Sequence, residues 1–229
     1  MAIHVYVGPT LPACEVIAVI PGASLHPPAR NGDLLSERLN PGDQVLLIDG
    51  IHHEAGSVRQ PEILDLLADG VIVVGAAGMG ALRAAELHEF GMAGVGEICD
   101  LYLAKLLTGT DEIATAYGRG PDYVKVSEAL VNIRHVLRLA RQIGFVGNRS
   151  VLALISHARA LPYAGRTWTR IGHSVRRSEP SLLPVLALVR DYARTNAAAM
   201  DLMALDARRA LGYVAAVPEL SAPASSIRL

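Results

Sequence analysis

Three short aliphatic segments, each closed by a turn, constrain the fold of this chain more than any other feature. Residues 3–7, 45–48 and 71–74 are rich in β-branched or aliphatic side chains, and each ends at Gly or Asp-Gly, as buried parallel strands do. Helical segments lie between them, at residues 34–39 and 62–68. This alternation predicts an α/β fold, in which a parallel sheet is flanked by helices in a Rossmann-like arrangement.

The last hundred residues have a different pattern. Helical periodicity follows Gly120-Pro121, with Ser at several helix starts, so we expect a mostly helical region. The expected helices cover residues 127–143, 150–161, 181–193 and 198–217. We therefore divide the chain into an α/β core over residues 1–119, a basic helical region over residues 120–217 and a flexible tail over residues 218–229.

Charge divides the chain in the same way. The net charge is −1, yet residues 1–119 hold 6 Lys and Arg against 15 Asp and Glu, and residues 120–229 hold 15 against 7. A basic half indicates an acidic partner, nucleic acid or docking onto the chain's own acidic half. Arg134, Arg138 and Arg141 follow i, i+4, i+7 spacing on one helix face. They predict a surface for docking another protein, with pairing inside the chain as the alternative.

Neither a membrane nor nucleic acid is an expected partner. The longest apolar stretches, residues 71–77 and 185–189, are far shorter than the roughly 20 residues that cross a bilayer. Residues 1–25 lack the basic segment that opens a signal peptide, which predicts a cytoplasmic protein. Cys14 and Cys99 are the two cysteines, and no Cys/His cluster has zinc-ligand spacing, so neither a disulfide framework nor a metal site is expected.

A glycine-rich loop joins the third expected strand to a helix over residues 81–90. Small residues there let the backbone approach a ligand closely, and a helix start favours an anion, although tight packing of the helix on the sheet explains them equally well. The spacing G-x-x-G-x-G is neither the dinucleotide fingerprint nor the phosphate loop, which disfavours a nucleotide-dependent enzyme. Residues 16–20 fit either a further strand or part of a helix.

Several ordered segments resemble the TfuA-like family. They are VGPTL at 7–11, PPARNGD at 27–33, IDG at 48–50, EIL at 62–64, GAAGMGALRAAEL at 75–87, GMAGVG at 91–96 and the pair Asp111-Glu112. The resemblance covers about half the chain and does not include the helical half. It implies an accessory protein for a YcaO enzyme, which uses ATP to activate a peptide amide and installs sulfur in backbone thioamidation.

The resemblance also implies partners. They are the YcaO protein, a ubiquitin-like sulfur carrier that ends in a glycine thiocarboxylate and, as a further candidate, the ribosomal precursor peptide. ATP would be used by the YcaO partner, so this chain is expected to need no cofactor. The family pattern commonly has Ser where this chain has Gly78, and His where it has Gln60. Two functions therefore stay open: a thiocarboxylate hydrolase that releases sulfide, and a non-catalytic module that presents the carrier or the peptide.

Sulfide release needs an attacking water or nucleophile, a proton shuttle and donors for the oxyanion. Asp49, Glu62 and Thr10 are the catalytic candidates, because strand ends are where α/β proteins bind ligands. Asp49 and Thr10 could instead cap turns. The substrate-binding candidates are Gly8, His52, Gly75, Gly78, Met79, Gly80, Arg83 and Glu86. We expect the loops at residues 8–10, 49–52 and 75–80 to converge in one crevice.

Some of these candidates have an equally simple alternative. Arg83 could clamp a thiocarboxylate tail or form a surface pair with Glu86 three residues on, and Glu86 could orient Arg83 or face solvent. His52 and His53 could bind a metal ion, serve acid–base chemistry or lie in water. Cys14 could carry a persulfide if a helix start or a cation lowered its pKa, or it could be a small hydrophobic residue.

Overall fold

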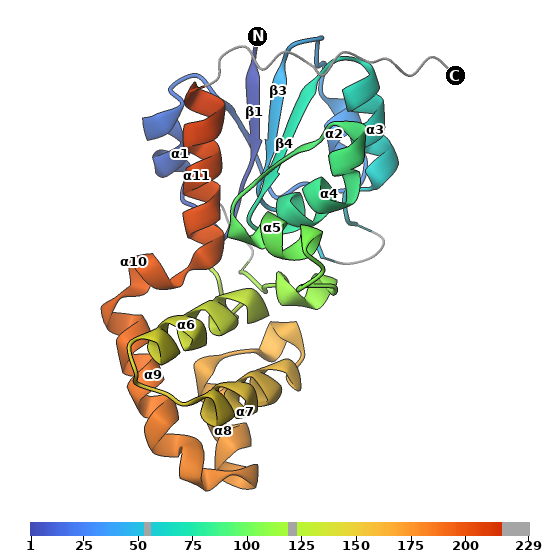
Figure 1. Ribbon diagram of the computed structural model, residues 1–229. Helices are drawn as coiled ribbons and strands as arrows, with labels where there is room; N and C mark the ends of the chain where they lie inside the picture. The colour runs from blue at the N-terminus through green and yellow to red at the C-terminus, as the bar shows by residue number, and fades with distance from the viewer. Residues whose placement is uncertain (53–55, 119–122, 217–229) are drawn as a thin grey trace. The chain divides into compact units, whose positions relative to one another are not determined.

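The computed structural model describes residues 1–52, 56–118 and 123–216, which form two compact units (Figure 1). The α/β unit contains residues 1–110 together with the last helix, from residue 203 onward. The helical unit contains residues 111–202. The expected boundary between residues 119 and 120, and the expected tail over residues 218–229, lie outside the described residues.

A five-stranded parallel sheet forms the centre of the α/β unit, with strand order β2-β1-β3-β4-β5. Its strands are β1 (Ile3–Tyr6), β2 (Ser24–His26), β3 (Gln44–Leu47), β4 (Ile72–Ala76) and β5 (Ala93–Val95). Val5 pairs with Leu46, and Leu46 pairs with Val74, so the three predicted strands lie side by side in the middle of the sheet. Their fully buried aliphatic side chains form the core, which confirms the predicted α/β fold.

Helices flank this sheet on both faces. They are α1 (Ala13–Val19), α2 (Asp33–Ser36), α3 (Gln60–Ala68), α4 (Met79–Leu87), the 3-10 turn η1 (His88–Phe90), α5 (Glu97–Leu103) and α11 (Leu202–Ala216). Figure 1 shows α1 and α11 on one side of the sheet and α3 and α4 on the other. An ion pair between Glu15 and Arg208 joins α1 to α11. Residues 16–20, for which a strand or a helix was open, lie mostly in α1.

The helical unit packs its helices around a core of its own. Its elements are η2 (Thr110–Glu112, which begins at the last residue of the α/β unit), α6 (Leu130–Gln142), α7 (Asn148–Arg159), η3 (Tyr163–Gly165), α8 (Trp168–Ser178), η4 (Pro180–Leu182), α9 (Leu183–Thr195) and α10 (Ala197–Met200). Leu137, Leu154, Val175 and Val189 are among the buried residues of this core. The expected helix over residues 198–217 is interrupted at Asp201, whose extended backbone separates α10 from α11.

A fully buried arginine joins the first residues of the helical unit to its helices. Arg166 is 0% exposed, and its guanidinium donates to the Asp111 carboxylate over 2.6 Å. It also donates to the main-chain carbonyls of Asp111, Ala158 and Leu161. The Asp111-Glu112 pair of the family pattern therefore has a structural task here, because Glu112 in turn accepts two hydrogen bonds from Arg134.

Among the described helices, none combines the length and the apolar character needed to cross a membrane.

Candidate functional site

The strand order locates the part of the sheet where a ligand is expected. From β1 the chain continues to β2 on one side, and later strands β3, β4 and β5 build out on the other side. In doubly wound sheets, ligands bind outside the carboxyl ends of the strands where this reversal occurs. Here that point lies between the ends of β1 and β3, where the first strand leads to Thr10 and the third leads to Asp49.

Asp49 joins these two strand ends through its carboxylate. One oxygen, Oδ2, accepts the backbone N–H groups of Gly8 at 2.8 Å and Thr10 at 3.1 Å. The other, Oδ1, accepts the Thr10 hydroxyl at 2.6 Å. Asp49 is 4% exposed, whereas Thr10 is only partly buried. By accepting the two N–H groups, Asp49 caps the turn after β1, as the alternative expectation had it. The short hydrogen bond from the Thr10 hydroxyl also polarises that hydroxyl, which solvent can reach.

The turn between β4 and α4 approaches Asp49 from the third strand end. Ala77 is buried with a φ of 60°, a left-handed conformation that costs a residue with a side chain roughly 1–2 kcal/mol. Strained turns of this kind occur at functional sites. A Cβ built on the next residue, Gly78, would lie 3.6 Å from Asp49 Oδ1 and 3.3 Å from the Ile48 carbonyl oxygen. The three loops therefore meet, and we call Gly8, Thr10, Asp49 and Gly78 the strand-end site.

The other glycines of this turn permit close packing. A Cβ on Gly80 would lie 1.7 Å from the carbonyl oxygen of Leu47, and a Cβ on Gly75 would lie 2.1 Å from the carbonyl oxygen of Gly80. Met79 is buried at the start of α4, against Gly50. These contacts account for the glycines as helix-on-sheet packing, and the ligand-binding role of Gly75, Met79 and Gly80 stays a prediction.

Glu62 lies at the start of α3, where it caps the helix. Its carboxylate accepts the backbone N–H of Arg59 at 3.2 Å, which forms part of a capping box. The second carboxylate oxygen accepts the N–H of Gly32 at 2.7 Å. Glu62 thus fastens the loop before α2 to α3, and its catalytic role stays a prediction.

Arg83 and Glu86 form an ion pair three residues apart on α4, with side chains 11% and 35% exposed, and the ligand-binding role of both residues stays a prediction. The Arg83 guanidinium donates to the Glu86 carboxylate at 2.5 Å and to the Val58 carbonyl at 2.9 Å. Gln60 donates to the same Glu86 oxygen at 2.9 Å. Glu86 therefore orients Arg83. His52 lies half-buried after β3, and His53 lies outside the described residues.

The three arginines expected to form a docking face have different surroundings in α6. Arg134 forms a two-bond pair with Glu112 at 2.8 and 2.9 Å, which matches the alternative of pairing inside the chain. Arg138 donates to His135, and Arg141, which is exposed, donates to Asn148. Arg141 is thus the most accessible of the three.

We expect Arg134→Gln to lower the free energy of unfolding by about 1–2 kcal/mol, because it leaves the buried Glu112 carboxylate without its charged partner. Arg141→Gln serves as the control and should change stability by less than about 0.5 kcal/mol, since its partner is an exposed amide. Urea denaturation followed by Trp168 fluorescence measures both. Equal stability of the two variants would show that the Arg134–Glu112 pair contributes nothing.

Two buried residues of α11 also contribute to the strand-end region, and the sequence did not indicate them. The Met203 methyl group would lie 3.1 Å from a Cβ on Gly78. Asp206 is 0% exposed and accepts the backbone N–H of Ile98 at 2.8 Å, so it caps α5 from a distant part of the chain. Burial raises the pKa of the Asp206 carboxyl, although hydrogen bonds from Ile98 and Glu97 and the charge of Arg209 oppose this rise.

The two cysteines differ in their surroundings. Cys99 is buried in α5, as expected, and burial raises the pKa of its thiol to about 11, with Asp100 and Asp206 adding to the rise. Cys14 is exposed in the first turn of α1. An exposed thiol there is open to reaction, and its role as a persulfide carrier stays a prediction.

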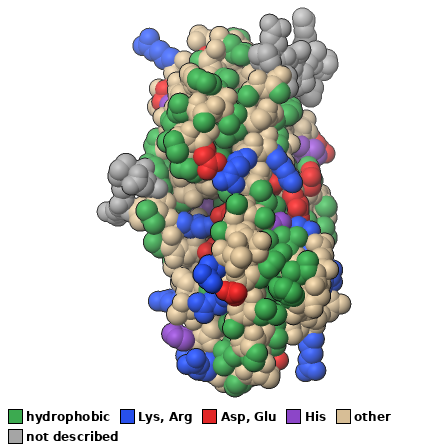
Figure 2. Space-filling model, turned by 90° about the vertical axis from the view of Figure 1, so that its left-hand side faces the viewer, with side chains coloured by type: hydrophobic (Ala, Val, Ile, Leu, Met, Phe, Trp, Pro, Cys, Tyr) green, Lys and Arg blue, Asp and Glu red, His purple; other side chains and the backbone are tan. Residues whose placement is uncertain are grey.

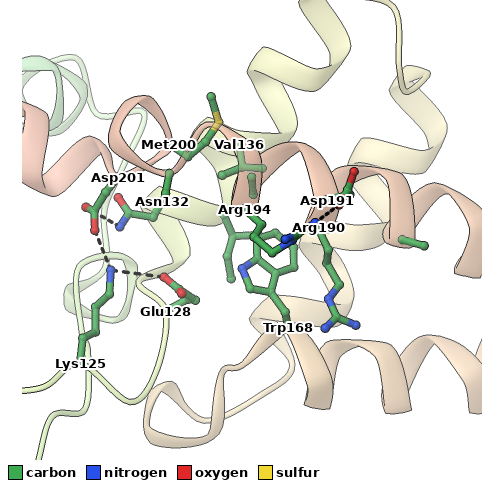
Figure 3. A pocket seen from close by; sticks show the side chains of 14 residues that line it. Lys125, Glu128, Asn132, Val136, Trp168, Arg190, Asp191, Arg194, Met200 and Asp201 are labelled. Carbon is green, nitrogen blue, oxygen red and sulfur yellow. Dashed lines mark hydrogen bonds and ion pairs between the residues drawn. The ribbon is translucent and has the colours of Figure 1, made fainter.

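A pocket of about 630 Å³ lies within the helical unit, formed mainly by α6, α9 and the segments beside them. Figure 3 shows Lys125, Glu128, Asn132 and Asp201 gathered at one end and Trp168, Arg190 and Arg194 at the other. Val136 and Met200 contribute apolar surface. The lining thus combines an aromatic ring and apolar side chains with three cations and three carboxylates, Glu128, Asp191 and Asp201.

The ammonium group of Lys125 stays charged in this pocket. It contacts the Asp201 carboxylate at 2.6 Å and the Glu128 carboxylate at 3.5 Å. Burial opposes the charge, but the two carboxylates outweigh burial and raise the pKa of Lys125. Trp168, which begins α8, belongs to a helix that was not predicted, although Thr167 caps its start and Ile171 and Val175 have helical spacing.

The amino-acid composition of the helical unit is basic within its observed boundaries. Residues 111–202 carry 13 Lys and Arg against 7 Asp and Glu. On the face drawn in Figure 2, Lys and Arg side chains are spread over this unit with hydrophobic side chains between them.

The fold and the strand-end site together define a doubly wound α/β protein that carries polar groups at its switch point. The sequence model of the family described as TfuA-like protein matches residues 49–167, which is just over half of the chain. The chain belongs to the TfuA-like family. A comparison with curated proteins found no match. The matched region begins at Asp49, contains the glycine-rich loop and extends to residue 167 of the helical unit, so the expectation that the resemblance does not include the helical half was wrong. Family membership supports a role associated with thioamide biosynthesis.

Proposed function

We propose that this protein works beside a YcaO enzyme in peptide backbone thioamidation, where it releases sulfide from the thiocarboxylated end of a ubiquitin-like sulfur carrier. The observation that carries this proposal is the 2.6 Å hydrogen bond from the Thr10 hydroxyl to the buried Asp49 carboxylate. This pair lies at the switch point of the sheet, beside the strained turn at Ala77. It supplies a basic group and an oriented hydroxyl at the place where α/β proteins bind ligands.

The chemistry required of this pair is the addition of water to a thiocarboxylate. The Thr10 proton points at Asp49, so the lone pairs of its oxygen are free to hold the attacking water against the carbonyl carbon. A C–O bond forms, the C–S bond breaks, and the protons of the water leave with the sulfur as hydrogen sulfide while the carrier keeps a carboxylate. Asp49 acts as the base in this step, because it accepts the hydrogen bond of the Thr10 hydroxyl, which in turn accepts one from the water.

Thr10→Val tests this role, because Val matches Thr in shape and lacks the hydroxyl. We expect the rate of sulfide release from a purified thiocarboxylated carrier to fall at least roughly 100-fold, in the range that positioned acid–base groups contribute. Thr10→Ser is the matched control, which restores the hydroxyl and should keep the rate within several-fold of the parent. A Val variant as fast as the parent would remove Thr10 from the chemistry.

A non-catalytic binding module is the second candidate function, and two observations favour it. Gly78 offers no hydroxyl at the turn where relatives commonly have Ser, and the helical unit contains the Trp168 pocket. In this function the chain presents the carrier or the precursor peptide to the YcaO enzyme and breaks no bond. It would release no sulfide alone, yet would raise the thioamide yield when the YcaO enzyme, ATP and the peptide are present.

The only tryptophan of the chain makes this second function directly measurable. Trp168 lines the pocket, so its fluorescence should respond when a carrier or a precursor peptide occupies the helical unit. In the same proposal, Arg138 and Arg141 contact the partner protein. The electrostatic contribution to the affinity should then fall as the salt concentration rises.

A further inference from the structure

Two histidines and a glutamate gather on the face of the sheet near its β2 edge, apart from the strand-end site. His4 belongs to β1 and His26 to β2, and Glu37 follows α2 directly. His4 Nδ1 lies 3.0 Å from His26 Nε2, and His26 Nδ1 lies 3.5 Å from Glu37 Oε1. One ligand atom from each residue lies within 4.8 Å of the other two. His4 is buried, while His26 and Glu37 are partly exposed.

The sheet register brings the rings together. Tyr6 is the direct partner of His26 in the parallel pairing of β1 with β2, and His4 lies two residues before Tyr6 on the same face. The His26 ring stacks on Tyr6 at a centroid distance of 4.6 Å and on His4 at 5.2 Å. This stacking fixes the orientation of both imidazoles, which is what a preformed ligand set requires.

Tyr6 provides a second, independent observation. It is 2% exposed, and its buried hydroxyl has no hydrogen-bond partner among the described residues. Buried hydroxyls are normally paired, so this hydroxyl is available to a group that the described residues do not supply. The carboxylates of Glu37, Asp33 and Glu62 lie close enough to Tyr6 to act on its hydroxyl by their charge, so the surroundings are acidic, which favours a cation.

We propose that His4, His26 and Glu37 bind a divalent transition-metal ion of the zinc class, which ties the edge strand β2 to β1 and to the segment after α2. Two imidazoles and one carboxylate are ligands that such ions prefer, and a tetrahedral ion would keep a fourth position for water. Imidazole nitrogens bound to one tetrahedral zinc lie about 3.3 Å apart, close to the 3.0 Å between His4 Nδ1 and His26 Nε2. His26 would bind the ion through Nε2, so the Glu37 carboxylate, which lies 3.5 Å from Nδ1, would turn toward the ion on binding.

Spacing along the chain gave no sign of the cluster, because its residues come from two strands and a helix end.

Zinc titration of the full chain, after treatment with a chelator, tests the proposal. We expect one equivalent of Zn²⁺ to bind in calorimetry, Co²⁺ to give the absorption of a tetrahedral site, and zinc to raise the melting temperature. His26→Gln should weaken zinc binding at least 100-fold, and Glu37→Gln at least tenfold. Both side chains are partly exposed, so both variants should fold without metal, which circular dichroism checks.

Matched controls are present in the chain. His88→Gln removes an exposed histidine of η1 whose ring contacts the Ala85 carbonyl, and it should leave zinc affinity unchanged. The proposal is overturned if no saturable one-to-one binding occurs, or if folded His26→Gln keeps the parent affinity. It is equally overturned if substitution of His52 and His53 abolishes the binding, since the ion would then occupy that loop.

Discussion

Gly80→Ala is expected to destabilise the α/β unit by at least about 3 kcal/mol, because the added methyl group would overlap main-chain atoms. The Cβ would lie 1.7 Å from the Leu47 carbonyl oxygen and 2.6 Å from its carbon, and neither can turn away as a side chain could. Relief requires α4 to move off the sheet, which would also pull the Gly78 turn away from Asp49. Urea unfolding followed by circular dichroism measures the loss.

Gly212→Ala is the control for this experiment. Gly212 lies in the interior of α11, is exposed, and a Cβ there would meet no atom within 4 Å. Alanine should therefore raise stability by about 0.5–1 kcal/mol through helix propensity alone. If Gly80→Ala unfolds at the same urea concentration as the parent protein, the close contact of α4 with β3 does not exist.

Arg166→Met is expected to destabilise the helical unit by about 3 kcal/mol, since it replaces a fully buried guanidinium with an apolar side chain of similar length. The Asp111 carboxylate and the carbonyls of Ala158 and Leu161 would lose their donor. Asp111 is 49% exposed, so water compensates part of the loss at that carboxylate. The carbonyls are less easily satisfied.

Arg194→Met provides the comparison. The Arg194 side chain is 80% exposed and pairs with Asp191 three residues earlier, an interaction worth less than about 0.5 kcal/mol. Trp168 lies two residues after Arg166, so its fluorescence reports the melting of this unit in both variants. Identical melting temperatures for the two variants would mean that Arg166 does not hold η2 to the helices.

The central strands could be predicted from sequence because each is a run of aliphatic residues closed by a turn. The edge strands β2 and β5 contain three residues each, which is too short for a recognisable pattern. The meeting of Thr10 with Asp49 could also be predicted, since parallel strands bring their carboxyl ends to one edge. This property of parallel sheets predicts a contact between two residues that are 39 positions apart in the sequence.

Other features depend on contacts that periodicity does not encode. Helical spacing predicted a helix over residues 198–217 but could not show that α11 covers the sheet, because an amphipathic pattern does not identify its partner. The role of Asp206 was missed for this reason. Its carboxylate accepts the N–H of Ile98 only because α11 packs beside the start of α5. The pocket around Trp168 was missed with α8, and the pairing of Arg134 with Glu112 required knowledge of the chain path.

The return of α11 to the α/β unit has a consequence for the order of folding during synthesis. The ribosome makes residues 1–110 first, then the whole helical unit, and only then the helix that supplies Met203 and Asp206. Until that helix emerges, α5 lacks its cap, and the Gly78 turn lacks the side chain that covers it. The α/β unit that begins first is thus completed last, and a nascent chain stalled before residue 203 would hold an unfinished strand-end site.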